Sequence, residues 1–228
     1  MENVEIKILE FLKGLGTILL YLVVSILLGQ IWGDWLYGDS VVLASVLQVL
    51  SYLILLLVLG LVYHKRMIRD FKNFKKEYVF VALKNWIIGI GAMIIANIIV
   101  SSLGGVATNE EANRSILSTY PISSVLTMVF IGPLVEELTF RAGFKKAFSK
   151  WYTFALVTAL IFGTAHIQSF FSTHNIYELL YLIPYSTLGF FFAKAFYETD
   201  NIYTSYLAHM FHNGLCVLLL FVFSLIGG

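Results

Sequence analysis

The chain has 228 residues, of which 59% are hydrophobic and only 13% are charged, and its formal net charge is +1. A soluble domain of this length carries about 25% charged residues, so the composition excludes an ordinary water-soluble protein and, with a mean hydropathy of +0.83, indicates an integral membrane protein. The near-neutral charge and the lack of a basic, aromatic-rich arm argue against nucleic-acid binding, and the lone Cys216 excludes an intramolecular disulfide.

The N-terminal stretch MENVEIKILEFLK lacks the features of a signal peptide. It carries acidic residues where a signal peptide has a positive region, and no small-residue cleavage pattern follows the apolar stretch. We therefore expect the first apolar segment to be retained as a membrane helix.

Apolar segments long enough to cross the hydrocarbon core, which takes about 20 residues, recur along the whole chain. They span residues 12–33, 40–64, 79–102, 123–148, 151–171, 176–197 and 202–226. Gly132-Pro133 lies in the fourth segment, where the missing backbone donor could kink or break the helix, so six or eight crossings are alternatives. The sequence thus predicts an all-α, polytopic membrane helix bundle of about seven transmembrane helices, with residues 1–228 forming a single integral membrane domain.

Basic residues concentrate in the connectors that lie on one side of the membrane if each apolar segment crosses it once. The connector after the second segment holds six of the 15 basic residues: Lys65, Arg66, Arg69, Lys72, Lys75 and Lys76. Putting this connector in the cytosol also puts there Lys7, Lys13, Lys145, Lys146, Lys150 and Lys194, and leaves only Arg114 outside. The bias predicts a cytosolic N-terminus and, for an odd number of spans, an outer C-terminus. The connector is interpreted as a topology determinant, with a lipid or substrate patch as the alternative.

Two adjacent glutamates and an arginine interrupt the fourth segment, SSVLTMVFIGPLVEELTF and the residues after it. Charges at bilayer depth cost about 2.5–3.5 kcal/mol on insertion scales, so they usually face a cavity or a partner. Glu137 and Arg141 stand one helical turn apart, the spacing of an intrahelical ion pair, whereas Glu136 is rotated by about 100°. We expect Arg141 to neutralise Glu137 and to leave Glu136 free for proton chemistry; the structural alternative is an ion-pair cluster that holds helices together.

The next two polar clusters lie on later segments. In IFGTAHIQ, Phe162 and His166 share a helix face, and the small residues between them allow close helix approach. In SYLAHMFHNGLC, His209 and Asn213 converge on one face, with His212 about 60° around the helix from His209. Two neutral donors at this spacing suit the stabilisation of an oxyanion. For both clusters, hydrogen bonding between helices is the structural alternative.

With these three clusters the chain resembles the CAAX-prenyl endopeptidase and bacteriocin-processing family of intramembrane proteases, also called the CPBP or Abi family. The family's motifs are Glu-Glu-x-x-x-Arg, Phe-x-x-x-His and His-x-x-x-Asn/Asp, in that order on successive membrane helices. The matching residues are Glu136, Glu137, Arg141, Phe162, His166, His209 and Asn213. The resemblance covers a motif-bearing core of about residues 120–220.

The resemblance implies a glutamate-dependent endopeptidase without a cofactor. Glu136 and His166 would position and deprotonate a water, His209 and Asn213 would hold the oxyanion, and Glu137, Arg141 and Phe162 would support them. The substrate would be a peptide or membrane protein in the lipid bilayer. The small size and the composition suggest a multi-pass protein of a bacterial cell membrane, in bacteriocin leader or signalling-peptide processing or in self-immunity.

Other readings of these residues remain open on sequence grounds. Two histidines and a glutamate could bind zinc, although the His-Glu-x-x-His pattern is absent and Arg141 disfavours a nearby dication. The chain could be a non-catalytic membrane regulator or an immunity partner of a sensor kinase or transporter. It could also be a proton-coupled transporter, against which stand its small size and the lack of an inverted repeat.

Overall fold

The computed structural model describes residues 2–36 and 38–227, which form helices joined by short connections and contain no strand. The longer helices are α1 (Glu2–Leu36), α2 (Val41–Lys72), α3 (Lys76–Ser102), α7 (Trp151–Ala165), α10 (Leu182–Thr199) and α11 (Ile202–Gly227). The shorter helices are α4 (Thr108–Thr119), α5 (Pro121–Ser124), η1 (Val125–Ile131), α6 (Gly132–Glu137), η2 (Leu138–Ala142), η3 (Lys145–Ala147), α8 (Gln168–Thr173) and α9 (Ile176–Leu179).

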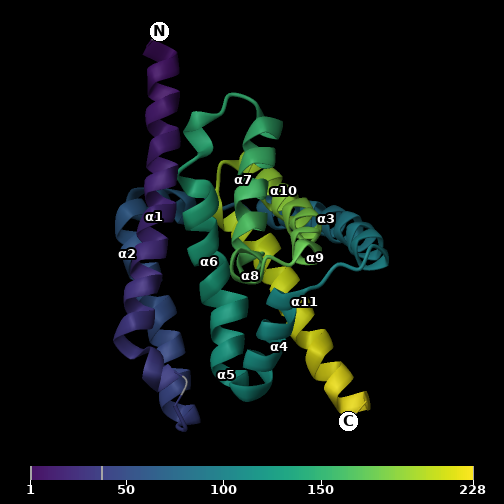
Figure 1. The fold of residues 1–228 in the computed structure, drawn as a ribbon. Helices are drawn as coiled ribbons and strands as arrows, with labels where there is room; N and C mark the ends of the chain where they lie inside the picture. Colours follow the sequence, from purple (N-terminus) through teal and green to yellow (C-terminus); the bar gives the residue numbers. More distant parts are fainter. Residues whose placement is uncertain (1, 37, 228) are drawn as a thin grey trace.

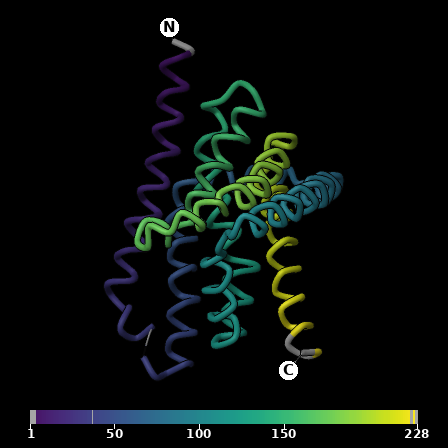
Figure 2. The backbone as a smooth tube through the Cα atoms, turned by 45° about the vertical axis from the view of Figure 1, so that its right-hand side comes forward, coloured from purple at the N-terminus to yellow at the C-terminus, as the bar shows by residue number. Residues whose placement is uncertain are grey.

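Six helices within the described residues are long and apolar enough to cross a membrane, which confirms the predicted polytopic helix bundle. They are Val4–Leu36 in α1, Val41–Lys72 (α2), Lys76–Ser102 (α3), Pro121–Ala147 (α5 to η3), Ile176–Thr199 (α9 and α10) and Ile202–Phe223 in α11. The α1 and α2 helices run side by side as an antiparallel pair, whereas α3 crosses the other helices at a steep angle (Figures 1 and 2). The start of α1 and the end of α11 lie at opposite ends of the bundle (Figure 1).

The segment predicted to span residues 151–171 is shorter than expected. The α7 helix ends at Ala165, after 15 residues, and α8 begins at Gln168. The helix ends because the backbone N–H of His166 bonds Gly163 O and that of Ile167 bonds Thr164 O, which tightens the last turn. The predicted length is therefore wrong, and α7 is a short apolar helix rather than a full span.

The fourth predicted segment continues through Gly132-Pro133 without a break. Its middle is π-helical over η1, so the N–H of Gly132 bonds Thr127 O, five residues earlier, instead of Met128 O. Pro133 has no N–H to continue this pattern, which leaves Met128 O without a partner from its own helix. The carbonyl accepts instead from Asn213 Nδ2 on α11, at 2.8 Å.

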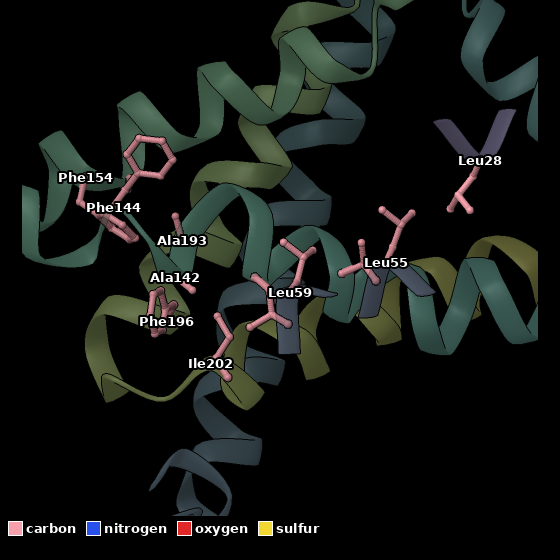
Figure 3. Close-up of a cluster of buried hydrophobic side chains, with 12 residues drawn as sticks. Leu28, Leu55, Leu59, Ala142, Phe144, Phe154, Ala193, Phe196 and Ile202 are labelled. Atoms are coloured by element: carbon pink, nitrogen blue, oxygen red, sulfur yellow. The ribbon is translucent and has the colours of Figure 1, made fainter. Parts of the chain in front are cut away.

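Polar contacts fix the start of α11 against the end of α2. The buried Asp70 carboxylate accepts from the N–H of Ile202 at 2.9 Å, and Asn201 Nδ2 donates to Asp70 O at 2.6 Å. A carboxylate at a helix N-terminus stabilises the helix. Beside these contacts, buried side chains from α1, α2, α7, α10 and α11 pack with Ala142 and Phe144 (Figure 3). The start of the helix that carries His209 is therefore firmly placed.

Candidate active site

Glu137 and Arg141 form the ion pair that their spacing predicts. Both side chains are 0% exposed, and Arg141 Nη1 donates to Glu137 Oε1 at 2.5 Å. The Arg141 guanidinium also lies over the Phe162 ring, 4.6 Å from its centroid, and donates to Gly189 O at 3.4 Å. The pair thus joins the fourth span to α7 and α10.

Glu136 points away from this pair, toward two imidazoles. Its Oε2 atom lies 3.9 Å from His166 Nε2 and 3.8 Å from His209 Nε2. The same oxygen has no hydrogen-bond partner among the described residues. The three clusters that the sequence shows on separate segments therefore meet at one carboxylate oxygen.

The ring of His166 is oriented by the end of its own helix. Because the N–H of His166 bonds Gly163 O, it leaves the carbonyl of Phe162, and His166 Nδ1 lies 2.8 Å from that oxygen. A carbonyl only accepts, so Nδ1 carries the proton. Nε2 of the neutral ring then has a free lone pair, and this nitrogen faces Glu136.

His209 connects the two glutamates. Its Nδ1 lies 3.0 Å from Glu137 Oε1, and its ring stacks on Phe192 with centroids 4.8 Å apart. Glu137, paired with Arg141, acts as an acceptor, so Nδ1 of His209 is protonated. Donation from Nε2 to an oxyanion therefore requires the imidazolium, rather than the neutral donor that the sequence suggests.

Asn213 contacts a backbone carbonyl instead of the other three polar side chains. One of its amide hydrogens satisfies Met128 O, and its second N–H remains for another acceptor. His212, which shares α11, lies with Nε2 3.6 Å from Cys216 Sγ. The structure thus brings Glu136, His166 and His209 together and places Asn213 one turn further along α11.

Tyrosines from outside the motif segments complete the surroundings of Glu136. Tyr21 on α1 and Tyr52 on α2 lie within electrostatic range of Glu136. A Cβ placed on Gly132, one turn before Glu136, would lie 3.3 Å from Tyr52 Cε1. Sequence reasoning missed these residues, because an isolated tyrosine in an apolar helix has no signature of its own.

The site combines a carboxylate and two imidazoles in a largely buried setting. Within the part of the chain that the structure describes, no group of three or more His, Cys, Asp or Glu residues is arranged to hold a metal ion. A carboxylate beside an imidazole with a free lone pair can hold a water molecule and take a proton from it. Such an arrangement suits hydrolysis.

Comparison with known proteins matches the part of the chain that carries these residues. Residues 118–215 match the family described as Type II CAAX prenyl endopeptidase Rce1-like. An uncharacterized protein of Mycoplasma capricolum subsp. capricolum is 32% identical over 102 residues, which cover 44% of this chain and 28% of that protein. YdiL of Bacillus subtilis (strain 168), named as a candidate membrane peptidase, is 25% identical over 125 residues, which cover 53% of this chain and 46% of YdiL.

The chain spans less than half the length of either curated relative, and no solved structure matches it. The family match confirms the predicted resemblance over residues 118–215, a range that contains every motif residue from Glu136 to Asn213. The six apolar helices indicate a multi-pass membrane protein, and residues 118–215 are similar to membrane peptidases of the CAAX protease type.

Proposed function

We propose, from the resemblance of residues 118–215 to the CAAX prenyl endopeptidase family and from the geometry at Glu136, that the protein is an intramembrane endopeptidase. It hydrolyses a peptide bond with a water molecule that Glu136 and His166 activate. The observation that carries the proposal is the position of Glu136 Oε2, 3.9 Å from a histidine nitrogen that has its lone pair free.

A water molecule fits between the two groups. A separation of 3.9 Å is too long for a direct hydrogen bond, and a water about 2.8 Å from each atom bridges it. The water donates one hydrogen to Glu136 Oε2 and the other to His166 Nε2, so its oxygen lone pair is directed at a substrate carbonyl. When the water oxygen bonds to the carbonyl carbon, its proton passes to Glu136.

His209 stabilises the charge that forms on the carbonyl oxygen. As an imidazolium between Glu137 and Glu136, it donates from Nε2 to the oxyanion, and Asn213 adds its second N–H. Collapse of the tetrahedral intermediate breaks the C–N bond, and the amine leaves with the proton held by Glu136. Phe162 packs against both imidazole rings and holds them in position, since its ring centroid lies 4.2 Å from that of His166 and 5.6 Å from that of His209.

The substrate class follows from the setting of the site. A site within apolar helices is reached by a peptide or a membrane protein that enters the bilayer. We expect a bacterial substrate of this kind, such as a bacteriocin leader or a signalling peptide.

The test compares wild-type protein and Glu136→Gln, both purified in detergent. The probes are a fluorogenic farnesylated peptide with a C-terminal CAAX sequence and the peptides extracted from the host membrane. Wild type should shorten at least one peptide, and Glu136→Gln should slow that cleavage by about 10²–10⁴-fold, the usual contribution of a general base.

Glu111→Gln is the matched control, because Glu111 is an exposed glutamate on α4; it should cleave at the wild-type rate. Cleavage by Glu136→Gln at the wild-type rate, or no peptide that differs in length between the two samples, would contradict the proposed function.

A further inference from the structure

A polar cavity lined by basic residues lies apart from Glu136, His166 and His209. It has a volume of about 430 Å³ and lies between α1, α2 and the segment that follows Arg141. Its polar lining includes Glu10, Lys13, Tyr63, Arg66 and Lys146. The proposed hydrolysis uses none of these residues.

The cavity is cationic. Three basic side chains line it against one carboxylate, Glu10, which pairs with Lys13 at 2.7 Å. Lys146 has no ion-pair partner among the residues that the structure describes. An anion is therefore the complementary occupant.

Arg66 is the preorganised member of the set. Its side chain is 13% exposed, and Nη1 faces Asp70 Oδ2 at 3.6 Å and Asp200 Oδ1 at 3.4 Å. The guanidinium also lies 5.1 Å from the centroid of the Phe196 ring. Both ion pairs use Nη1, so the Nε and Nη2 groups are left to donate to a bound anion, and the planar guanidinium suits phosphate oxygens.

The cavity also has an apolar side that opens toward lipid. Leu20 and Val62 line it, and Val62 is 53% exposed on the outer surface of α2. Lys13, Arg66 and Lys146 lie near the predicted ends of the apolar segments 12–33, 40–64 and 123–148, where we expect lipid headgroups to begin. A molecule with both a phosphate and acyl chains matches both sides of the cavity, whereas free phosphate matches only one.

We propose that this cavity binds the phosphate headgroup of an anionic phospholipid, with its acyl chains along α1 and α2. Basic pockets between membrane helices on the cytoplasmic side bind such headgroups. The basic connector thus has a second role beside topology, because Arg66 belongs to it. The bound lipid joins α1 and α2 to Gly143, two residues after Arg141, where the helices already approach closely: a Cβ on Gly143 would lie 2.8 Å from Gly14 Cα.

Binding is measured on the full chain in nonionic detergent, by native mass spectrometry during titration with dioleoylphosphatidylglycerol. Wild type should retain one phosphatidylglycerol molecule and should bind dioleoylphosphatidylcholine at least about tenfold more weakly. Lys146→Glu should raise the half-saturating concentration of phosphatidylglycerol by at least about tenfold, because it removes an attractive charge and puts a repulsive one in its place.

Lys65→Glu is the matched control: it makes the same charge change on an exposed lysine next to Arg66 that does not line the cavity. It should leave the half-saturating concentration within about twofold of wild type. Equal weakening by both variants, or equal binding of the two lipids, would overturn the proposal. Displacement of phosphatidylglycerol by millimolar glycerol 3-phosphate would also overturn it, by showing that the cavity takes a soluble phosphate.

Discussion

At the scale of single residues, His209 contacts both glutamates, but through different nitrogens and in different ways. Its Nδ1 is bound by Glu137, which is paired with Arg141, and its Nε2 faces Glu136. One ring thus links a permanently paired carboxylate to one whose Oε2 has no hydrogen-bond partner within the described residues. The contrast gives the two glutamates different expected phenotypes.

Glu137→Gln should cost stability as well as activity. It leaves Arg141 as a fully buried cation without its carboxylate, and breaking a buried pair from one side typically costs about 3–5 kcal/mol. Thermal unfolding in detergent should show a lower midpoint for Glu137→Gln, whereas Glu136→Gln should unfold like wild type.

The double variant Glu137→Gln/Arg141→Met separates charge from packing, because it removes the buried cation as well. It should recover part of the lost stability and remain inactive. A wild-type unfolding midpoint for Glu137→Gln would contradict the structural role assigned to Glu137.

Tyr52→Phe should slow cleavage by about three- to tenfold with little change in stability. The Tyr52 ring lies against Gly132, one turn before Glu136, and we expect its hydroxyl to donate a hydrogen bond into the site during the reaction. A neutral hydrogen bond contributes about 0.5–1.5 kcal/mol. The measurement is the rate at which the peptide is cleaved. The control is Tyr78→Phe, on α3 away from the site, which should cleave at the wild-type rate. Equal rates for the two variants would rule out a role for Tyr52.

The sequence predicted much of the residue-scale arrangement. Helical spacing alone was enough to predict the Glu137–Arg141 pair and the separate direction of Glu136, and the structure confirms both. The contact of His209 with Glu137, and that of Asn213 with Met128 O, could not be predicted. Both depend on the rotation and depth of α11 relative to the fourth span, which the period of one helix does not specify.

At the scale of elements, the fourth span is held together by a side chain from another helix. Pro133 deprives Met128 O of a backbone donor, and Asn213 replaces it. The sequence indicated a kink or break at Gly132-Pro133, because a single helix has no means of satisfying that carbonyl by itself. A neighbouring helix and a π-helical turn supply the means.

A double-mutant cycle tests this replacement. Asn213→Ala should cost about 1–3 kcal/mol, because it leaves the partly buried Met128 carbonyl unsatisfied. In a Pro133→Ala background the same change should cost less, since residue 133 then has an N–H for Met128 O. Equilibrium unfolding in mixed micelles gives the four free energies, and an equal cost in both backgrounds would refute the replacement.

At the scale of the whole molecule, basic residues that are far apart in sequence gather at one end of the bundle. Lys13, Arg66 and Lys146 share a cavity there, and Lys84 and Lys194 both reach Glu198. Charge bias predicted a common side for Lys13, Arg66, Lys146 and Lys194 from sequence alone. The bias works because it counts connectors and needs no knowledge of how the helices pack.

We expect this basic end to face the cytosol. In a Cys216→Ala background, Lys72→Cys and Ser115→Cys introduce a thiol at exposed positions on the two sides. A membrane-impermeant maleimide added to intact cells should label Ser115→Cys, and Lys72→Cys only after permeabilisation. The reverse pattern would invert the orientation.

The shortness of α7 has a consequence for the bilayer itself. Its 15 residues rise about 22 Å, roughly 8 Å less than the hydrocarbon core, and Leu156 and Leu160 are exposed on its outer side. We therefore expect the bilayer to thin beside α7 to match its length, and this local dimple to bring bulk water toward His166 at the end of the helix. Cleavage should be faster in vesicles of dimyristoyl- than of dierucoylphosphatidylcholine, with the opposite order counting against the dimple. The hydrophobic mismatch of one short helix would then supply water, the second substrate of hydrolysis, to a site inside the bilayer.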